Sequence, residues 1–187
     1  MEKIAVYRRL VKLNDGQAVL LRPLVHEDQE ALVALFQATP EEDRRFLKHD
    51  VTDAALVRSW AEQIDYSQVL PIVAEVGGRI VGEAILRFGQ RSTRHVGEVR
   101  IYLEPAMRGK GLGTLMLKEI IALARRAGLH YLLAQIVLDQ TEVIKAFQNL
   151  GFKMEATIRD YFMTEDGKTH NVVILLLPLL AEAQYEF

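Results

Sequence analysis

The sequence predicts a mixed α/β fold, and three stretches carry that prediction. Residues 70–88 hold two apolar runs joined by a Gly-Gly pair, which is typical of a β-hairpin with a two-residue turn. A strand at 96–103 precedes a glycine-rich turn and an amphipathic helix at 112–127. A nearly continuous apolar run at 131–138 then fits a buried parallel strand. We expect a predominantly antiparallel sheet with one central parallel β-α-β crossover, flanked by helices.

Length and composition set limits on the class of protein. The chain has 187 residues, of which 50% are hydrophobic and 26% charged, so it can bury a core as a single domain over 1–187. Residues 1–16 are expected to add a strand or an N-terminal arm. The net charge of −2 argues against a nucleic-acid binder that relies on overall charge. The lack of cysteine excludes disulfides, thiolate zinc sites and a cysteine nucleophile.

The sequence also lacks several signals of location and of metal chemistry. No signal-peptide pattern opens it, and its longest apolar run, 172–180, is too short to cross a bilayer. The five histidines show no metal-ligand spacing, and neither HExxH nor GxSxG occurs. We therefore expect a cytoplasmic protein without a metal, a membrane or a nucleic-acid partner.

The N-terminal third predicts one strand and two helices. Segment 17–22 fits a strand that ends at a proline, which has no N–H for a sheet ladder. Residues 26–39 place apolar side chains on one face of a helix, with acidic residues in the first turn. The charged run 40–45 is expected to be a connection. Thr52 or Asp53 can cap the next helix.

The C-terminal part predicts the rest of the sheet. Gly128 is the expected end of the helix at 112–127. A short helix is expected at 140–150. A last strand pair, 153–159 with 171–177, closes the chain around a polar turn.

The turn at 108–113, RGKGLG, is the strongest functional signal. It joins a strand to a helix, and the first N–H groups of a helix lack intrahelical partners and lie at its positive end. Glycines let a phosphate approach these N–H groups closely. The spacing fits neither a Walker loop nor GxGxxG. Residues 87–126 carry nine Arg or Lys against three Glu, which suits a ligand with several phosphates.

Two motifs resemble those of one known family. The pattern R-x-x-G-x-G, formed by Arg108, Gly111 and Gly113, is similar to the pyrophosphate-binding segment of the GNAT superfamily of N-acetyltransferases. Segment 140–152, QTEVIKAFQNLGF, is similar to a second helix motif of that family. The resemblance covers about residues 17–178 and implies the GNAT fold, with acetyl-CoA as the acyl donor.

The resemblance also implies where acetyl-CoA binds. The backbone of 101–103 should pair with the pantetheine arm, because a bulge splays this strand from 131–138, and the amides of 108–114 should hold the pyrophosphate. Two residues of the second motif complete the implied set: its first residue, Gln140, and its aromatic position, Phe147. The implied cofactor-binding residues are Ile101, Tyr102, Leu103, Arg108, Gly109, Lys110, Gly111, Leu112, Gly113, Thr114, Gln140 and Phe147.

Transfer to an amine requires a base. An ammonium of pKa about 10.4 must lose its proton at pH 7, which costs roughly 4.6 kcal/mol. A carboxylate near the thioester can accept this proton. Glu98 is the first candidate, since its place resembles that of the base in the protein-lysine branch of the family; the alternative is a charge pair with Arg100 or Arg94. Glu104, beside a proline, is expected to be a solvated turn residue.

The sequence departs from the family pattern at the expected proton donor. The family commonly uses a tyrosine of the second motif to protonate the leaving thiolate, and here that position is Phe147. Glutamines stand at 135 and 140, where some members have a base or an asparagine. Water, Tyr102 or Tyr161 could supply the proton instead.

Two hypotheses of different classes follow. The first is an N-acetyltransferase that moves an acetyl group from acetyl-CoA to a primary amine of a protein or small molecule, directly within a ternary complex. The second is a non-catalytic acyl-CoA-binding sensor or regulatory module on the same fold. The apolar C-terminal strand could also pair with a second copy at a homodimer edge.

Overall fold

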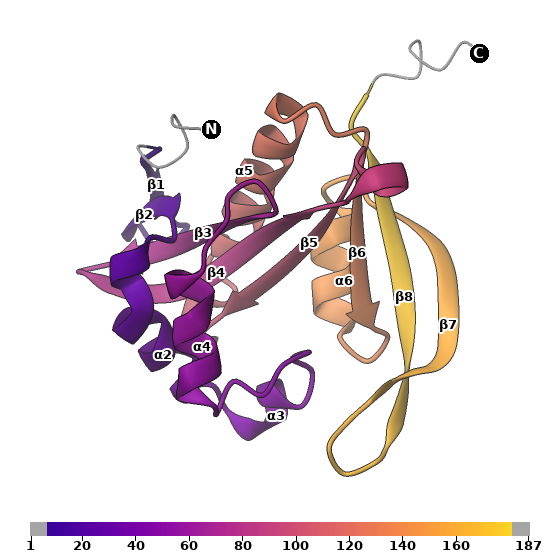
Figure 1. Ribbon diagram of the computed structural model, residues 1–187, viewed down its shortest axis with the longest axis horizontal. Helices are drawn as coiled ribbons and strands as arrows, with labels where there is room; N and C mark the ends of the chain where they lie inside the picture. Colours follow the sequence, from indigo (N-terminus) through magenta and orange to yellow (C-terminus); the bar gives the residue numbers. More distant parts are fainter. Residues whose placement is uncertain (1–6, 181–187) are drawn as a thin grey trace. The chain divides into compact units, whose positions relative to one another are not determined.

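The computed structural model describes residues 7–180, so the part of the predicted N-terminal strand or arm within 1–6 lies outside the described residues. Eight strands form a mostly antiparallel sheet in the order β1-β2-β3-β4-β5-β6-β8-β7, with β5 and β6 parallel (Figure 1). Helices flank the strands, which confirms the predicted mixed α/β fold. Two compact units are apparent, the residues up to Ile85 with Ile101–Leu117, and Leu86–Arg100 with the residues from Lys118. The single domain stays a prediction.

The elements follow the predicted order. The strands are β1 (Arg9–Lys12), β2 (Ala18–Pro23), β3 (Val69–Val76), β4 (Arg79–Phe88), β5 (Val96–Leu103), β6 (Tyr131–Val137), β7 (Lys153–Met163) and β8 (Thr169–Pro178). The α-helices are α2 (Gln29–Gln37), α3 (Glu41–Arg44), α4 (Ala54–Glu62), α5 (Leu112–Arg126) and α6 (Thr141–Gln148). Short 3-10 helices are η1 (His26–Asp28), η2 (Arg91–Thr93) and η3 (Pro105–Met107).

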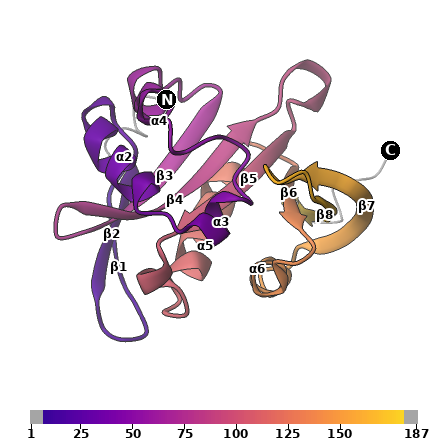
Figure 2. The same ribbon diagram turned by 90° about the horizontal axis from the view of Figure 1, so that it is seen from below.

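In the first unit, α2 and α4 pack together and cover one side of the strands (Figure 2). The Asp53 carboxylate caps α4 by accepting from the N–H groups of Ala55 and Leu56. The two helices share an apolar cluster in which Phe36 is buried and meets Trp60 edge-on, with ring centroids 5.5 Å apart. Trp60 is therefore part of the core, as its place on the helix predicts.

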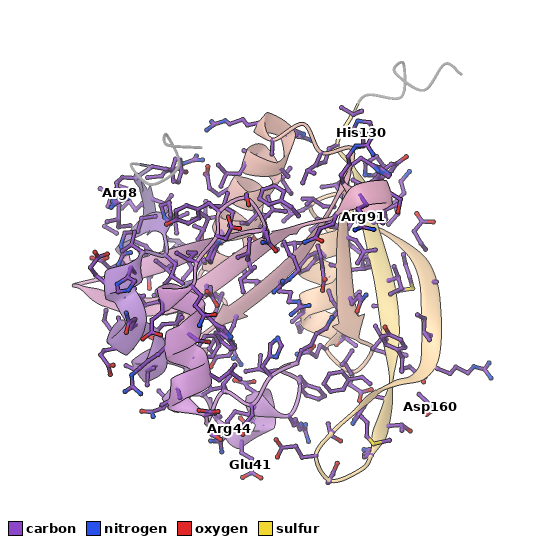
Figure 3. The ribbon with its side chains drawn as sticks, viewed as in Figure 1. Arg8, Glu41, Arg44, Arg91, His130 and Asp160 are labelled. Atoms are coloured by element: carbon purple, nitrogen blue, oxygen red, sulfur yellow. The ribbon has the colours of Figure 1, made fainter. Side chains whose placement is uncertain are left out.

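The charged run 40–45 is not a plain connection, which corrects the prediction. It contains the one-turn helix α3, which begins after Pro40 and has three acidic residues in its first turn. Acidic side chains are stabilised at a helix N-terminus by the helix dipole. Figure 3 shows Glu41 and Arg44 on this helix, with their side chains directed outward.

A buried ion-pair network joins β2, β3 and η1 in the first unit. Arg22 donates from Nη1 and Nη2 to the Asp28 carboxylate at 2.6 and 2.8 Å, and from Nε to Glu75 at 2.7 Å. These bonds raise the pKa of Arg22 above its ordinary value, chiefly through Asp28. Asp28 also accepts from the N–H of Val25 at 2.9 Å, so each of its oxygens has a partner.

In the second unit, β6 pairs in parallel with the first half of β5 and antiparallel with β8. Helix α6 lies against one face of β6 and β8 (Figure 2), and its buried Phe147 meets Phe152 edge-on at 5.0 Å. Strands β7 and β8 extend beyond the predicted 153–159 and 171–177. The pairing of β7 with β8 contains register shifts, one of them between Ile158 and Phe162. Asp160 lies within this shift and has a φ of +50°, and its side chain points outward (Figure 3).

Residues 7–180 contain no helix long and apolar enough to span a membrane. The same part of the chain has no group of three or more His, Cys, Asp or Glu side chains placed to hold a metal ion.

Glu83 on β4 is a buried acid of a different kind from Asp28. It is 4% exposed, and burial raises its pKa from 4.5 to about 7. The unfolded chain loses this proton near pH 4.5, whereas the folded chain keeps it to about pH 7. The folded state therefore binds more protons between these values, and stability falls as pH rises through this range.

We predict that Glu83→Gln removes this pH dependence. At pH 8 the variant should be more stable than the wild type by about 3 kcal/mol, and at pH 4 the two should be similar, because Glu83 is then neutral in both states. Urea unfolding at both pH values measures the difference. A variant with the same stability change at pH 4 and pH 8 would show that Glu83 does not titrate as its burial requires.

Candidate active site

The predicted phosphate-binding turn lies in the first unit and has the backbone shape that its glycines allow. Pro105 opens η3, Arg108 is extended, and Gly109 and Gly111 have φ values of +71° and +87°, in the left-handed region that favours glycine. α5 then starts at Leu112, and Leu115 donates the first helical bond to Gly111 O at 3.1 Å. The N–H groups just before Leu115 therefore stand at an open, electropositive helix start.

The segment after β1 supports this turn. The N–H of Asn14 donates to Lys110 O at 3.1 Å, and the Asn14 side chain lies 3.2 Å from where a Cβ on Gly111 would stand. Lys110 pairs with Asp15 at 3.2 Å. At Gly109, by contrast, an added Cβ would meet no atom within 4 Å, so one side of the turn is open. An anion could approach the backbone from that side.

The Arg108 guanidinium forms hydrogen bonds with other groups of the protein. Its Nε and Nη2 donate to Leu103 O at 3.1 and 2.9 Å, and Nη1 and Nη2 donate to the Asp43 carboxylate at 3.2 and 2.5 Å. These bonds tie the turn to the end of β5 and to α3, and Asp43 raises the pKa of Arg108. Arg108 thus positions the backbone, and we infer that it does so in place of neutralising a phosphate.

The predicted donor segment at the end of β5 presents two faces. Ile101 and Leu103 approach Gly113 of α5, at 3.9 and 3.4 Å from the position of an added Cβ. Tyr102, on the other face, stacks on Phe36 of α2 with ring centroids 5.5 Å apart. Its hydroxyl is buried, which raises its pKa, although the neighbouring Thr39 opposes the rise. Among the described residues, that hydroxyl has no partner at hydrogen-bond distance.

Glu104 is not the solvated turn residue that the sequence predicts. Arg79 donates to both of its carboxylate oxygens at 2.6 and 2.8 Å, and the Glu104 side chain is only 12% exposed. The partner lies 25 residues away on β4, so local sequence gives no sign of it.

Glu98, the predicted base, lies on the part of β5 that belongs to the second unit. It stands opposite Leu133 of β6, and Arg100 donates from Nε to Glu98 Oε1 at 2.9 Å. Its side chain is 23% exposed, so water or a substrate can reach it. The charge pair with Arg100, which the sequence offers as the alternative role, is therefore present and orients the Glu98 carboxylate. The catalytic role of Glu98 stays a prediction.

The two predicted residues of the second motif serve the structure of α6. Gln140 is the N-cap position, and its C=O accepts from the N–H of Ile144 at 3.1 Å. Phe147 is 2% exposed and packs in the core beside Phe152. Their contacts with acetyl-CoA stay predictions.

The second unit also has a basic surface hollow that contains none of the predicted catalytic or cofactor-binding residues. It measures about 490 Å³ and is lined by Ser92, Arg94, His95, Gly128 and His130. His130 and the neighbouring Arg91 are labelled in Figure 3.

One chemically capable residue escaped the sequence-based search. Glu83 is the single charged residue in the run IVGEAIL of β4, and it is buried there. A lone acid within an otherwise apolar strand was the available signal, since such a residue is rarely buried without a role.

The comparisons with known proteins agree with the resemblance of the sequence motifs to the GNAT family. The family model described as "Acetyltransferase (GNAT) family" matches residues 24–152. A relative from Bacillus subtilis (strain 168), named "Putative phosphinothricin acetyltransferase YwnH", is 26% identical over 157 residues, which is 83% of this chain and 96% of that protein.

A second relative is the L-methionine sulfoximine/L-methionine sulfone acetyltransferase of Salmonella typhimurium (strain LT2). It is 35% identical over 89 residues, and the match spans 46% of this chain and about half, 51%, of that protein. Among solved structures, yncA from Salmonella typhimurium, described with its cofactor acetyl-CoA, aligns with a TM-score of 0.76 and 23% identity, over 88% of this chain and 95% of its own. That likeness shows a shared fold.

The matched family model covers the strands β3 to β6, the glycine turn and the helices α2 to α6. This chain belongs to the GNAT family of acetyltransferases and is an acetyl-CoA-dependent N-acetyltransferase.

Proposed function

We propose that this enzyme transfers an acetyl group from acetyl-CoA directly to the primary amine of a small molecule or a protein while both substrates are bound. The observation that carries the proposal is the glycine turn at 108–114, whose left-handed residues present backbone N–H groups at the start of a fifteen-residue helix. This backbone would bind the pyrophosphate. The relatives are named for amino-acid derivatives, so free amino acids and their analogues are the first acceptors to test.

The donor segment would act through its backbone. N–H and C=O groups of 101–103 would hydrogen-bond to the pantetheine arm, and a backbone N–H of this strand would polarise the acetyl carbonyl. Leu103 O is already engaged by Arg108, which fixes the end of the segment. The arrangement lowers the barrier by orienting the thioester before the amine arrives.

Glu98 would take the proton of the acceptor. The ammonium releases H⁺ to the carboxylate, the neutral nitrogen attacks the acetyl carbon, the new C–N bond forms and the C–S bond breaks. Arg100, bonded to Glu98 Oε1 at 2.9 Å, holds the carboxylate in one orientation during this step.

A second candidate function, an acyl-CoA-binding sensor, is favoured by one observation. Phe147 stands where the family commonly has a tyrosine, and it is buried against Phe152 without a group that could donate a proton. Acetyl-CoA binding without turnover on a broad amine panel would support this function.

We predict that Glu98→Gln slows transfer by about 100-fold or more, because an amide cannot accept the proton. The loss should shrink as pH rises toward the pKa of the acceptor, since water then deprotonates the amine. Thiol release measures turnover, and calorimetry should give an unchanged Kd for acetyl-CoA. The exposed surface residue Glu142 supplies the control variant Glu142→Gln, which should behave as wild type. Equal rates for Glu98→Gln and wild type would rule out this base.

We predict that Gly111→Ala weakens acetyl-CoA binding by about 10-fold or more. Its φ of +87° strains any side chain, and the new Cβ would press on Asn14 at 3.2 Å and shift the turn. Gly78→Ala is a matched control. Gly78 has a φ of +81° in the β3–β4 turn, but a Cβ added there would meet no atom within 4 Å. Both variants should lose about 1 kcal/mol of stability, and only Gly111→Ala should change the Kd measured by calorimetry. Equal affinities for the two would contradict the assignment of the turn.

A further inference from the structure

We propose that Asp43 is a positioning residue for acetyl-CoA: by holding the Arg108 guanidinium, it keeps the glycine turn and the end of β5 in the arrangement that binds the donor. The inference rests on the proposed binding of acetyl-CoA at the turn 108–114, and it adds a residue that lies 65 positions before Arg108. Three features of the first unit support it: the bidentate bond between the two side chains, the contacts that hold each of them, and the exposure of the other acids of α3.

The Arg108 guanidinium binds two partners at once. Its Nη1 and Nη2 donate to the two carboxylate oxygens of Asp43 at 3.2 and 2.5 Å. Its Nε and Nη2 donate to Leu103 O at 3.1 and 2.9 Å. A bidentate bond to a carboxylate fixes the plane of a guanidinium. Asp43 therefore sets the direction in which Nε points, and with it the bond that joins the turn to the end of β5.

Both side chains are held by their own surroundings. The C=O of Asp43 accepts from the N–H of Phe46 at 3.0 Å, so the backbone of Asp43 is fixed within and just after α3. The Arg108 guanidinium lies over the Tyr102 ring, 5.9 Å from its centroid. Tyr102 in turn stacks on Phe36 of α2. The ion pair thus rests on the helix that precedes α3 in the chain.

Asp43 differs from the other acids of α3. The helix carries Glu41, Glu42 and Asp43 in its first turn. Glu41 and Glu42 are exposed, and Figure 3 shows Glu41 directed outward, whereas the Asp43 side chain is 21% exposed and meets Arg108. One acid of α3 is therefore directed at the turn, and its neighbour Glu42 supplies a matched comparison.

Charge and position predict opposite effects of Asp43 on the affinity for acetyl-CoA. The carboxylate repels phosphates, and its bonds keep the Arg108 cation away from them, so on charge alone the loss of Asp43 would strengthen binding. On position, the loss of Asp43 weakens binding, because the turn must then be ordered when the donor binds. We expect the second effect to be larger, since Arg108 already spends its Nε and Nη2 donors on Leu103 O.

The test measures the Kd for acetyl-CoA by calorimetry and the steady-state constants of Asp43→Asn. We expect the Kd and the KM for acetyl-CoA to rise about 10-fold, which is the scale of one lost hydrogen bond to a charged group. At saturating acetyl-CoA, kcat should stay close to that of the wild type. Asp43→Glu, which keeps the carboxylate, should recover part of the affinity. Glu42→Gln removes the same charge from an exposed position of α3 and should bind acetyl-CoA as the wild type does.

A double-mutant cycle tests whether Asp43 acts through Arg108. In the Arg108→Lys background the bidentate bond is already lost, so Asp43→Asn should change the Kd by less than about threefold. A full 10-fold loss in both backgrounds would show that Asp43 acts by another route and would overturn the proposal.

Hydrogen exchange gives a readout without turnover. The amides of 43–47 donate the backbone bonds of α3 and of the turn that follows it. Because a residue that aids ligand binding is itself stabilised by the ligand, acetyl-CoA should slow the exchange of these amides in the wild type and not in Asp43→Asn. Unchanged exchange in the wild type would overturn the proposal even if a variant folded poorly.

The remaining outcomes separate this inference from the proposed function. Tighter binding or an unchanged Kd in Asp43→Asn, together with weaker binding in Gly111→Ala, would reject the role of Asp43 and keep the turn as the donor site. An unchanged Kd in both variants would reject the turn as the donor site, and the role of Asp43 with it.

Discussion

The contacts of the Arg108 guanidinium are the constraint on which the first unit depends. One side chain joins the glycine turn to Leu103 at the end of β5 and to Asp43 on α3. A planar guanidinium with five N–H donors can make these bonds together, whereas a lysine ammonium could not reproduce their geometry. In this structure Arg108 therefore fixes the backbone of the turn through these bonds.

The glycine turn depends on the bonds of Arg108 because ordering its glycines is entropically costly. Left-handed glycines lose more conformational freedom on folding than any other residues. Arg108 fixes the turn on one side, and Asn14, which donates to Lys110 O, fixes it on the other. The helix dipole of α5 adds the positive potential. A rigid turn holds its N–H groups ready, so that less entropy is lost when an anion binds.

The sequence predicts the elements well where the signal is local. The Gly77-Gly78 hairpin, with φ values of +57° and +81°, and the Asp53 cap follow directly from residue type and spacing. The mixed sheet with its parallel β5–β6 pair and the family membership were also predictable. α3 was not, because four residues are too few to give a helical period, and the true length of β7 depends on register shifts against β8.

The candidate site likewise contains residues that the sequence predicts and contacts that it does not. Arg108 and its glycines could be found from spacing, and Glu98 from its place before them. The bonds of Arg108 to Asp43, 65 residues away, and of Glu104 to Arg79, 25 residues away, form only in the folded chain. Burial is likewise a tertiary property. The sequence shows that an acid occupies position 83, and only the fold shows that it is buried and that none of the residues 7–180 pairs with it.

Within residues 7–180, Asp28 and Glu83 are two buried acids in opposite environments. Asp28, 7% exposed, receives two bonds from Arg22 and one from Val25, and its charge is satisfied. Glu83, 4% exposed, receives none from the described residues and destabilises the enzyme at neutral pH. Replacing it with an apolar residue would relieve that cost.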